Sequence, residues 1–94
     1  MNDQTTKNKA IYMYTPLCGT CQLAGKMLDI AKEVLPAIQL EKVNLNYAKE
    51  MAEEYQVESV PCLILVKDSQ VEEKIYAFHS VPFLVERLSS IVAS

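Results

Sequence analysis

The sequence has no long hydrophobic run, no cluster of basic residues and no internal repeat. Its polar N-terminus lacks the apolar stretch of a signal peptide, and the apolar run that follows is far shorter than the roughly 20 residues needed to cross a bilayer. Nine Lys and Arg are scattered among twelve Asp and Glu, and the formal net charge is −3. The sequence therefore has no basic cluster of the kind that binds the phosphate backbone of a nucleic acid. We therefore expect no nucleic-acid partner, no membrane partner and no secretion.

Cysteine, glycine and proline are also scarce, with three, two and four residues. Three cysteines with one close pair do not resemble the even, spread framework of disulfide-stapled extracellular domains, so we expect a cytoplasmic protein. A chain of 94 residues, half of them hydrophobic, is long enough for one small core. We predict a single domain over residues 1–94 that is monomeric, with residues 1–8 as a flexible tail.

Hydrophobic periodicity, punctuated by the few prolines, divides the chain into seven elements. Pro16 ends a first strand, and Pro36 explains where the first helix stops. The order is β-α-β-α-β-β-α, which predicts the α/β fold class with helices on both faces of the sheet. The predicted strands cover residues 9–14, 38–45, 62–67 and 71–78, and the predicted helices cover 19–34, 48–57 and 80–93.

Two of the cysteines, Cys18 and Cys21, are separated by two residues at the junction between a strand and a helix. A structural disulfide there would close a four-residue loop, which by chain entropy stabilises by about 2 kcal/mol, against about 3 kcal/mol for a fifteen-residue loop. A zinc site would need Cys62 and His79 as its other ligands, and that spacing matches no zinc finger or ribbon. Inert, buried cysteines are a third alternative. We expect no metal.

The redox interpretation makes direct use of the local structure. A C-x-x-C motif that opens a helix presents its first sulfur to the helix N-terminus, where free amides and the macrodipole favour a thiolate. Cys18 would be the exposed nucleophile, and Cys21, one turn further on, would resolve the mixed disulfide. Gly19 would let the backbone bend tightly between them. Thr20 adds neither a cation nor a proline, so we expect moderate activation of Cys18, which suits a reductant.

Two motifs in register resemble the thioredoxin family. The segment LCGTC (17–21) after a core strand resembles the family's W-C-G-P-C, and SVPCLILV (59–66) resembles its I-P-T-L strand start. The resemblance runs from Ala10 to the C-terminus and lacks only the family's additional N-terminal strand and helix. It implies a four-stranded mixed sheet in which the first strand lies between the second and third, and the fourth strand is antiparallel.

The resemblance also implies a substrate-binding surface beside the cysteine pair. The Val60–Pro61 bond should be cis, and the backbone of Val60 should hydrogen-bond an extended substrate by strand addition. Leu17 and Ala77 should complete an apolar docking rim. No bound cofactor is implied.

The sequence departs from the family pattern beneath the second cysteine. Tyr12 stands where thioredoxins have a buried aspartate, and a phenol is a poor base at neutral pH. Lys42 matches a family lysine near that aspartate, and we expect it to be solvated because it has no acid to meet. At three further positions, Leu17, Tyr14 and Lys26 replace two tryptophans and a proline.

Two further residues each have more than one interpretation at this point. Cys62 follows Pro61 in an apolar run and is most simply a small buried hydrophobic residue. The alternative is a third redox thiol that captures Cys21 or a glutathione. His79, the single histidine, is expected to be a solvated turn residue.

The resemblance favours a thiol–disulfide oxidoreductase that reduces disulfide-containing protein substrates and receives electrons from a thioredoxin reductase-type donor. A glutathione-dependent, glutaredoxin-like activity is the alternative, although that family's Gly-Gly-Asp tripeptide is absent. The second alternative is a catalytically weak binding module with the same fold.

Overall fold

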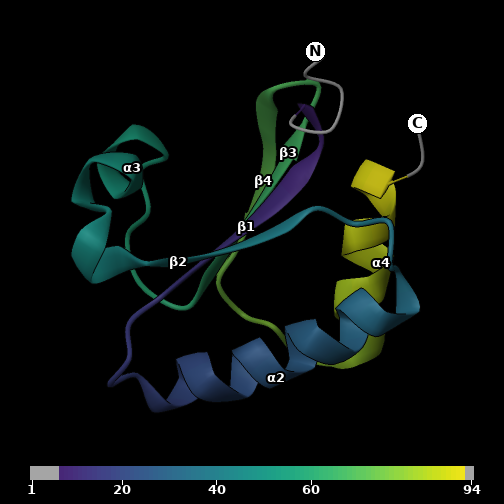
Figure 1. Ribbon diagram of the computed structural model, residues 1–94, viewed down its shortest axis with the longest axis horizontal. Coiled ribbons are helices and arrows are strands. Elements are labelled where there is room, and N and C mark those ends of the chain that lie inside the picture. Colours follow the sequence, from purple (N-terminus) through teal and green to yellow (C-terminus); the bar gives the residue numbers. More distant parts are fainter. Residues whose placement is uncertain (1–6, 93–94) are drawn as a thin grey trace.

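The centre of the molecule is a four-stranded sheet in the order β2-β1-β3-β4, seen in a computed structural model that describes residues 7–92 (Figure 1). β1 (Lys9–Tyr14) and β2 (Leu40–Asn44) are parallel. β3 (Cys62–Lys67) runs antiparallel to β1, and β4 (Gln70–Ile75) runs antiparallel to β3. The predicted strand order and mixed sheet are confirmed. Of the tail predicted over residues 1–8, residues 1–6 lie outside the described residues.

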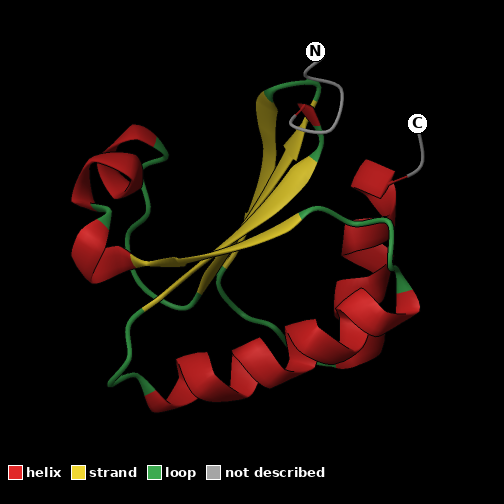
Figure 2. Cartoon of the chain, viewed as in Figure 1, coloured by secondary structure: helices red, strands yellow, loops and turns green. Residues whose placement is uncertain are grey.

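Helices flank both faces of this sheet, which confirms the α/β fold class. α2 (Gly19–Val34) and α4 (Val81–Val92) cover one face, and the short α3 (Lys49–Glu54) lies on the other (Figures 1 and 2). Among residues 7–92, no helix has the length and apolar character needed to span a membrane.

Two hydrophobic cores result from the alternation of side chains along the strands. The larger core lies between the sheet and the pair α2 and α4, and the smaller core lies between the sheet and α3. Central members of the larger core are Tyr12, Leu28, Leu63, Leu84 and Leu88, and those of the smaller core are Ile11, Met13, Cys62, Ile64 and Val66.

Turn and cap residues account for the ends of several elements. The Ser80 hydroxyl accepts a hydrogen bond from the Phe83 amide at 3.2 Å and so caps α4, as its position in the sequence predicts. Asp68 and Ser69 join β3 to β4 with φ angles of 55° and 67°. Positive φ at both central residues is the conformation that suits a two-residue hairpin, so the predicted hairpin is confirmed.

The region predicted as one helix over residues 48–57 differs in the structure. Only Lys49–Glu54 form a helix there, α3, and a 3₁₀ turn, η1 (Leu45–Tyr47), comes before the predicted region. Ala48, with φ −143° and ψ 46°, separates the two, and Gln56 leaves helical geometry with φ 56°.

Candidate functional site

The two cysteines of the C-x-x-C motif are joined by a disulfide at the start of α2, with their Cα atoms 5.1 Å apart. Cys18 is the N-cap residue in extended geometry, and its Sγ accepts a hydrogen bond from the Cys21 amide at 3.1 Å. The Thr20 Oγ1 lies 3.3 Å from the same sulfur. The helix N-terminus therefore directs an N–H group and a hydroxyl at Cys18, where negative charge is favoured.

The two sulfurs differ sharply in access. Cys21 is 3% exposed, whereas Cys18 is half-buried and follows Leu17, which is 98% exposed. An incoming partner can thus reach Cys18 and not Cys21. A Cβ atom at Gly19 would meet nothing within 4 Å, and its φ is not positive, so neither space nor backbone conformation requires glycine there.

A groove beside the redox pair is walled on one side by α2 and on the other by Pro61. The Val60–Pro61 bond is cis, as predicted. Val60 packs partly against the smaller core, and Ala77 is exposed between two residues of the groove wall. The groove has a volume of about 340 Å³ and is lined by Thr20, Leu23, Ala24, Met27, Pro61, Tyr76, Phe78 and His79.

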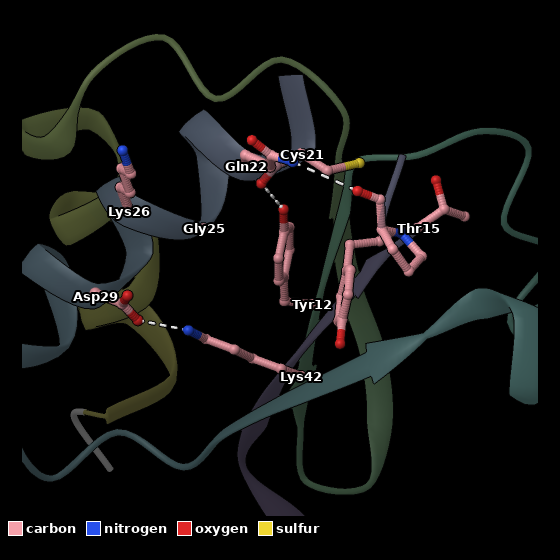
Figure 3. Close-up of a pocket in the computed structure, with 10 residues that line it drawn as sticks. Tyr12, Thr15, Cys21, Gln22, Gly25, Lys26, Asp29 and Lys42 are labelled. Atoms are coloured by element: carbon pink, nitrogen blue, oxygen red, sulfur yellow. Dashed lines mark hydrogen bonds and ion pairs between the residues drawn. The ribbon is translucent and has the colours of Figure 1, made fainter. Parts of the chain in front are cut away.

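On the other side of α2, a cavity of about 420 Å³ lies beneath Cys21. Figure 3 shows Tyr12 rising from β1 towards α2, where its hydroxyl donates a hydrogen bond to the Cys21 carbonyl. Burial, followed by electrostatic interactions with the neighbouring Tyr14 and Asp29, raises the pKa of Tyr12 to about 12. Tyr12 therefore stays neutral at physiological pH and serves as a hydrogen-bond donor to the first turn of α2, not as a base.

The expectation that Lys42 meets no acid is wrong. Its Nζ lies 2.6 Å from Asp29 Oδ1, so that the ion pair joins β2 to α2 along the wall of this cavity (Figure 3). Asp29 is eight residues after Cys21, which places it on the same face of the helix two turns further on. That spacing is the signal from which the partner could have been found. Both side chains are exposed, so the pair contributes little to stability.

The neutral phenol predicts a particular dependence of stability on pH. The folded pKa of Tyr12 exceeds the ordinary value of 10.0, so the unfolded chain loses this proton first as the pH rises. The contribution of the protonated Tyr12 to the free energy of unfolding is complete below pH 10 and is lost as the pH rises towards 12. Between about pH 9 and about pH 12, we expect the free energy of unfolding to fall by about 2 kcal/mol more in the native protein than in Tyr12→Phe.

Urea denaturation of both proteins across this range measures the difference. Other tyrosines and lysines titrate in both proteins, so their effects cancel in the comparison. Parallel curves would show that Tyr12 does not have the raised pKa.

The structure does not bring Cys62 together with the redox pair. Its side chain is fully buried in the smaller core, on the face of the sheet opposite α2. Burial raises the pKa of the Cys62 thiol, although the nearby Tyr76 hydroxyl and Lys74 partly oppose this. The position agrees with a small buried hydrophobic residue, and the third-thiol hypothesis remains a prediction.

His79 is an exposed residue between β4 and α4, as predicted, with φ 54°. Its ring packs edge-on against Phe83, with centroids 4.7 Å apart. Within residues 7–92, no three His, Cys, Asp or Glu side chains form a group that could hold a metal ion.

The site combines an accessible sulfur and a buried sulfur at a helix N-terminus, and a cis-proline lies across the groove from that helix. These are the features that thiol–disulfide exchange requires. The class of protein that this fold and site define is the thioredoxin-fold thiol–disulfide oxidoreductases. The family model described as Thioredoxin matches residues 2–89, and the chain belongs to this family.

Individual relatives agree with that membership. The thioredoxin-like protein YusE of Bacillus subtilis is 53% identical over 76 residues, covering 81% of this chain and 72% of its own. The bifunctional thioredoxin reductase/thioredoxin of Mycobacterium leprae is 29% identical over 96% of this chain and 20% of its own. Among solved structures, a mutant thioredoxin from Halobacterium salinarum superposes with a TM-score of 0.85 at 21% identity, covering 98% of this chain and 83% of that one. The protein is therefore a thiol–disulfide oxidoreductase.

Proposed function

We propose that this protein is a protein-disulfide reductase, in which Cys18 is the attacking thiolate and Cys21 is the resolving thiol. The observation that carries the proposal is the difference between the two sulfurs. Cys18 is accessible and accepts an amide hydrogen bond at the N-terminus of α2, and Cys21 is buried one turn below it.

The reaction proceeds in two exchanges. The Cys18 thiolate attacks one sulfur of the substrate disulfide, which forms a mixed disulfide and releases the other substrate sulfur as a thiolate. Cys21 loses its proton to solvent and attacks the Cys18 sulfur, which releases the second substrate thiolate. Two electrons pass to the substrate, and the Cys18–Cys21 disulfide is the oxidised product.

The substrate contacts are part of the same proposal. Leu17 and Ala77 are exposed apolar residues that would border the docking surface, and the Val60 backbone next to Pro61 would pair with an extended substrate segment. Gly19 and Thr20 contribute the backbone and the hydroxyl near the Cys18 sulfur.

A thioredoxin reductase-type enzyme is the proposed electron donor. The Mycobacterium leprae relative supports this choice because its name joins a thioredoxin reductase to a thioredoxin. Glutathione is the alternative donor. The chain between β4 and α4 reads YAFHS and lacks the Gly-Gly-Asp tripeptide of glutaredoxins. We place this chemistry in the cytoplasm, where such donors keep thiols reduced.

The test is turnover of a protein disulfide such as insulin with two donor systems. One contains NADPH and a thioredoxin reductase, and the other contains glutathione, NADPH and glutathione reductase. We expect turnover at least about tenfold faster with the first system, and a two-electron potential near −270 mV for the cysteine pair. Faster turnover with glutathione would replace the proposal by the glutaredoxin-like activity, and no turnover with either would favour a binding module.

A further inference from the structure

Two side chains at the end of β4 reach the loop that leads to Pro61. Lys74 is the second-last residue of β4, and Tyr76 follows directly after the strand. Lys74 Nζ donates hydrogen bonds to the carbonyls of Tyr55 at 3.1 Å and Gln56 at 3.0 Å. The Tyr76 hydroxyl accepts a hydrogen bond from the Glu58 amide at 3.2 Å. Residues 55–58 are thus held by two anchors that lie 18 or 19 positions further along the chain.

The anchors act where the backbone bonds of α3 stop. The amides of residues 55–57 bond back to carbonyls of α3, whereas the carbonyls of Tyr55 and Gln56 and the amide of Glu58 bond to the side chains of Lys74 and Tyr76. Gln56, with φ 56°, then turns the chain out of helical geometry. Lys74 satisfies two carbonyls at this helix end, where a cation is also favoured by the helix dipole. Among residues 7–92, the bond from Glu58 to Tyr76 is the hydrogen bond nearest to Pro61 on its N-terminal side.

Tyr76 also has a second role, because it lines the groove beside the redox pair. Its ring lines the groove of about 340 Å³ together with Pro61 and, across the groove, Thr20 and Leu23 of α2. The hydrogen bond from Glu58 would lower the pKa of Tyr76, but burial and the adjacent Cys62 thiol together raise it, so the hydroxyl stays protonated. One side chain therefore forms part of the groove wall and also holds the loop that leads to the cis-proline.

We propose that Tyr76 and Lys74 are positioning residues for substrate docking, which fix residues 55–60 so that the Val60 backbone is ready to pair with an extended protein substrate. This inference rests on the proposed function, because it assigns a purpose to the docking segment of that reaction. A loop that is ordered in advance loses less conformational freedom when the substrate binds. Without the anchors, binding must supply that ordering, and affinity falls while the sulfur chemistry is unaffected.

The test compares Tyr76→Phe, Lys74→Met and the double variant, with dithiothreitol as the reductant and insulin as the substrate. Tyr76→Phe keeps the ring in the groove and removes only the hydroxyl. We expect KM for insulin to rise about fivefold in this variant, the equivalent of one ordinary hydrogen bond, with kcat changed less than about twofold. The double variant should show the larger increase in KM. Hydrogen exchange should show faster exchange of the Glu58 amide and its neighbours.

Tyr47→Phe is the matched control, because Tyr47 is 88% exposed on η1 and lies outside the groove. Hydroxyethyl disulfide, which has no backbone to pair with Val60, is the second substrate. A rise in KM for insulin alone, together with faster loop exchange, supports the proposal. An unchanged KM, or parallel losses of kcat with both substrates, overturns it. If the native protein and Tyr47→Phe also fail to turn over insulin, the proposed function fails, and this inference fails with it.

Discussion

Replacing Cys18 by serine is expected to lower the rate of protein-disulfide reduction by at least about 10³-fold. Cys18 is the sulfur that a substrate can reach, and a serine hydroxyl at this position neither ionises near neutral pH nor forms a disulfide. The buried Cys21 cannot take over the attack, because it is 3% exposed behind the first turn of α2. Initial rates with insulin and dithiothreitol measure the loss.

Cys21→Ser provides the matched comparison. This variant keeps the attacking thiolate and loses the resolving step, so we expect it to accumulate a mixed disulfide with the substrate that intact mass spectrometry detects. Cys62→Ala should keep most of the turnover, because that thiol lies on the opposite face of the sheet. If Cys18→Ser retained more than about a tenth of the native rate, or trapped substrate through Cys21, the assignment of the two cysteines would be reversed or wrong.

Leu28→Ala is expected to cause the largest loss of stability, about 2 to 5 kcal/mol from a total on the order of 5 to 15 kcal/mol. Leu28 is fully buried in the larger core, where α2 packs on the sheet and on α4. Truncation removes apolar contacts and leaves a cavity that a small core cannot fill by collapse. Equilibrium denaturation in urea measures the change.

Leu23→Ala is the control for that substitution. It is the same change on the same helix, at a residue that is 62% exposed. We expect a loss below about 1 kcal/mol. Equal losses at the two positions would mean that the sheet-facing side of α2 is not the one described.

The sequence predicted the elements whose limits are set locally. Proline residues and helical periodicity predicted β1 and α2 with the observed bounds, and the continuous apolar run predicted β3 over residues 62–67. The region around α3 was less predictable, because helix-forming composition extends through residues 48–57 and does not reveal the non-helical Ala48 or the left-handed Gln56. The carbonyl of Gln56 bonds to Lys74 of β4, and a contact over that distance in sequence is tertiary information.

The chemistry of the site was predictable to a similar degree. The C-x-x-C spacing and the resemblance to thioredoxins located the redox pair and the cis-proline. The contacts around them could not be obtained in the same way, because their partners are distant in sequence. Lys42 of β2 forms an ion pair with Asp29 of α2, and the Glu58 amide donates a hydrogen bond to the Tyr76 hydroxyl 18 residues away.

The order of strands leaves β2 and β4 at the two outer sides of the sheet, each with unpaired backbone groups along one side. Such sides are places where another chain can add a strand and begin aggregation. Exposed charged side chains occupy both, with Glu41 and Lys42 on β2 and Glu72 on β4. Charge at these positions discourages indiscriminate pairing between copies. In the proposed function the protein offers its backbone to an extended segment at Val60, and the charges on β2 and β4 disfavour the same kind of pairing between copies along the outer strands.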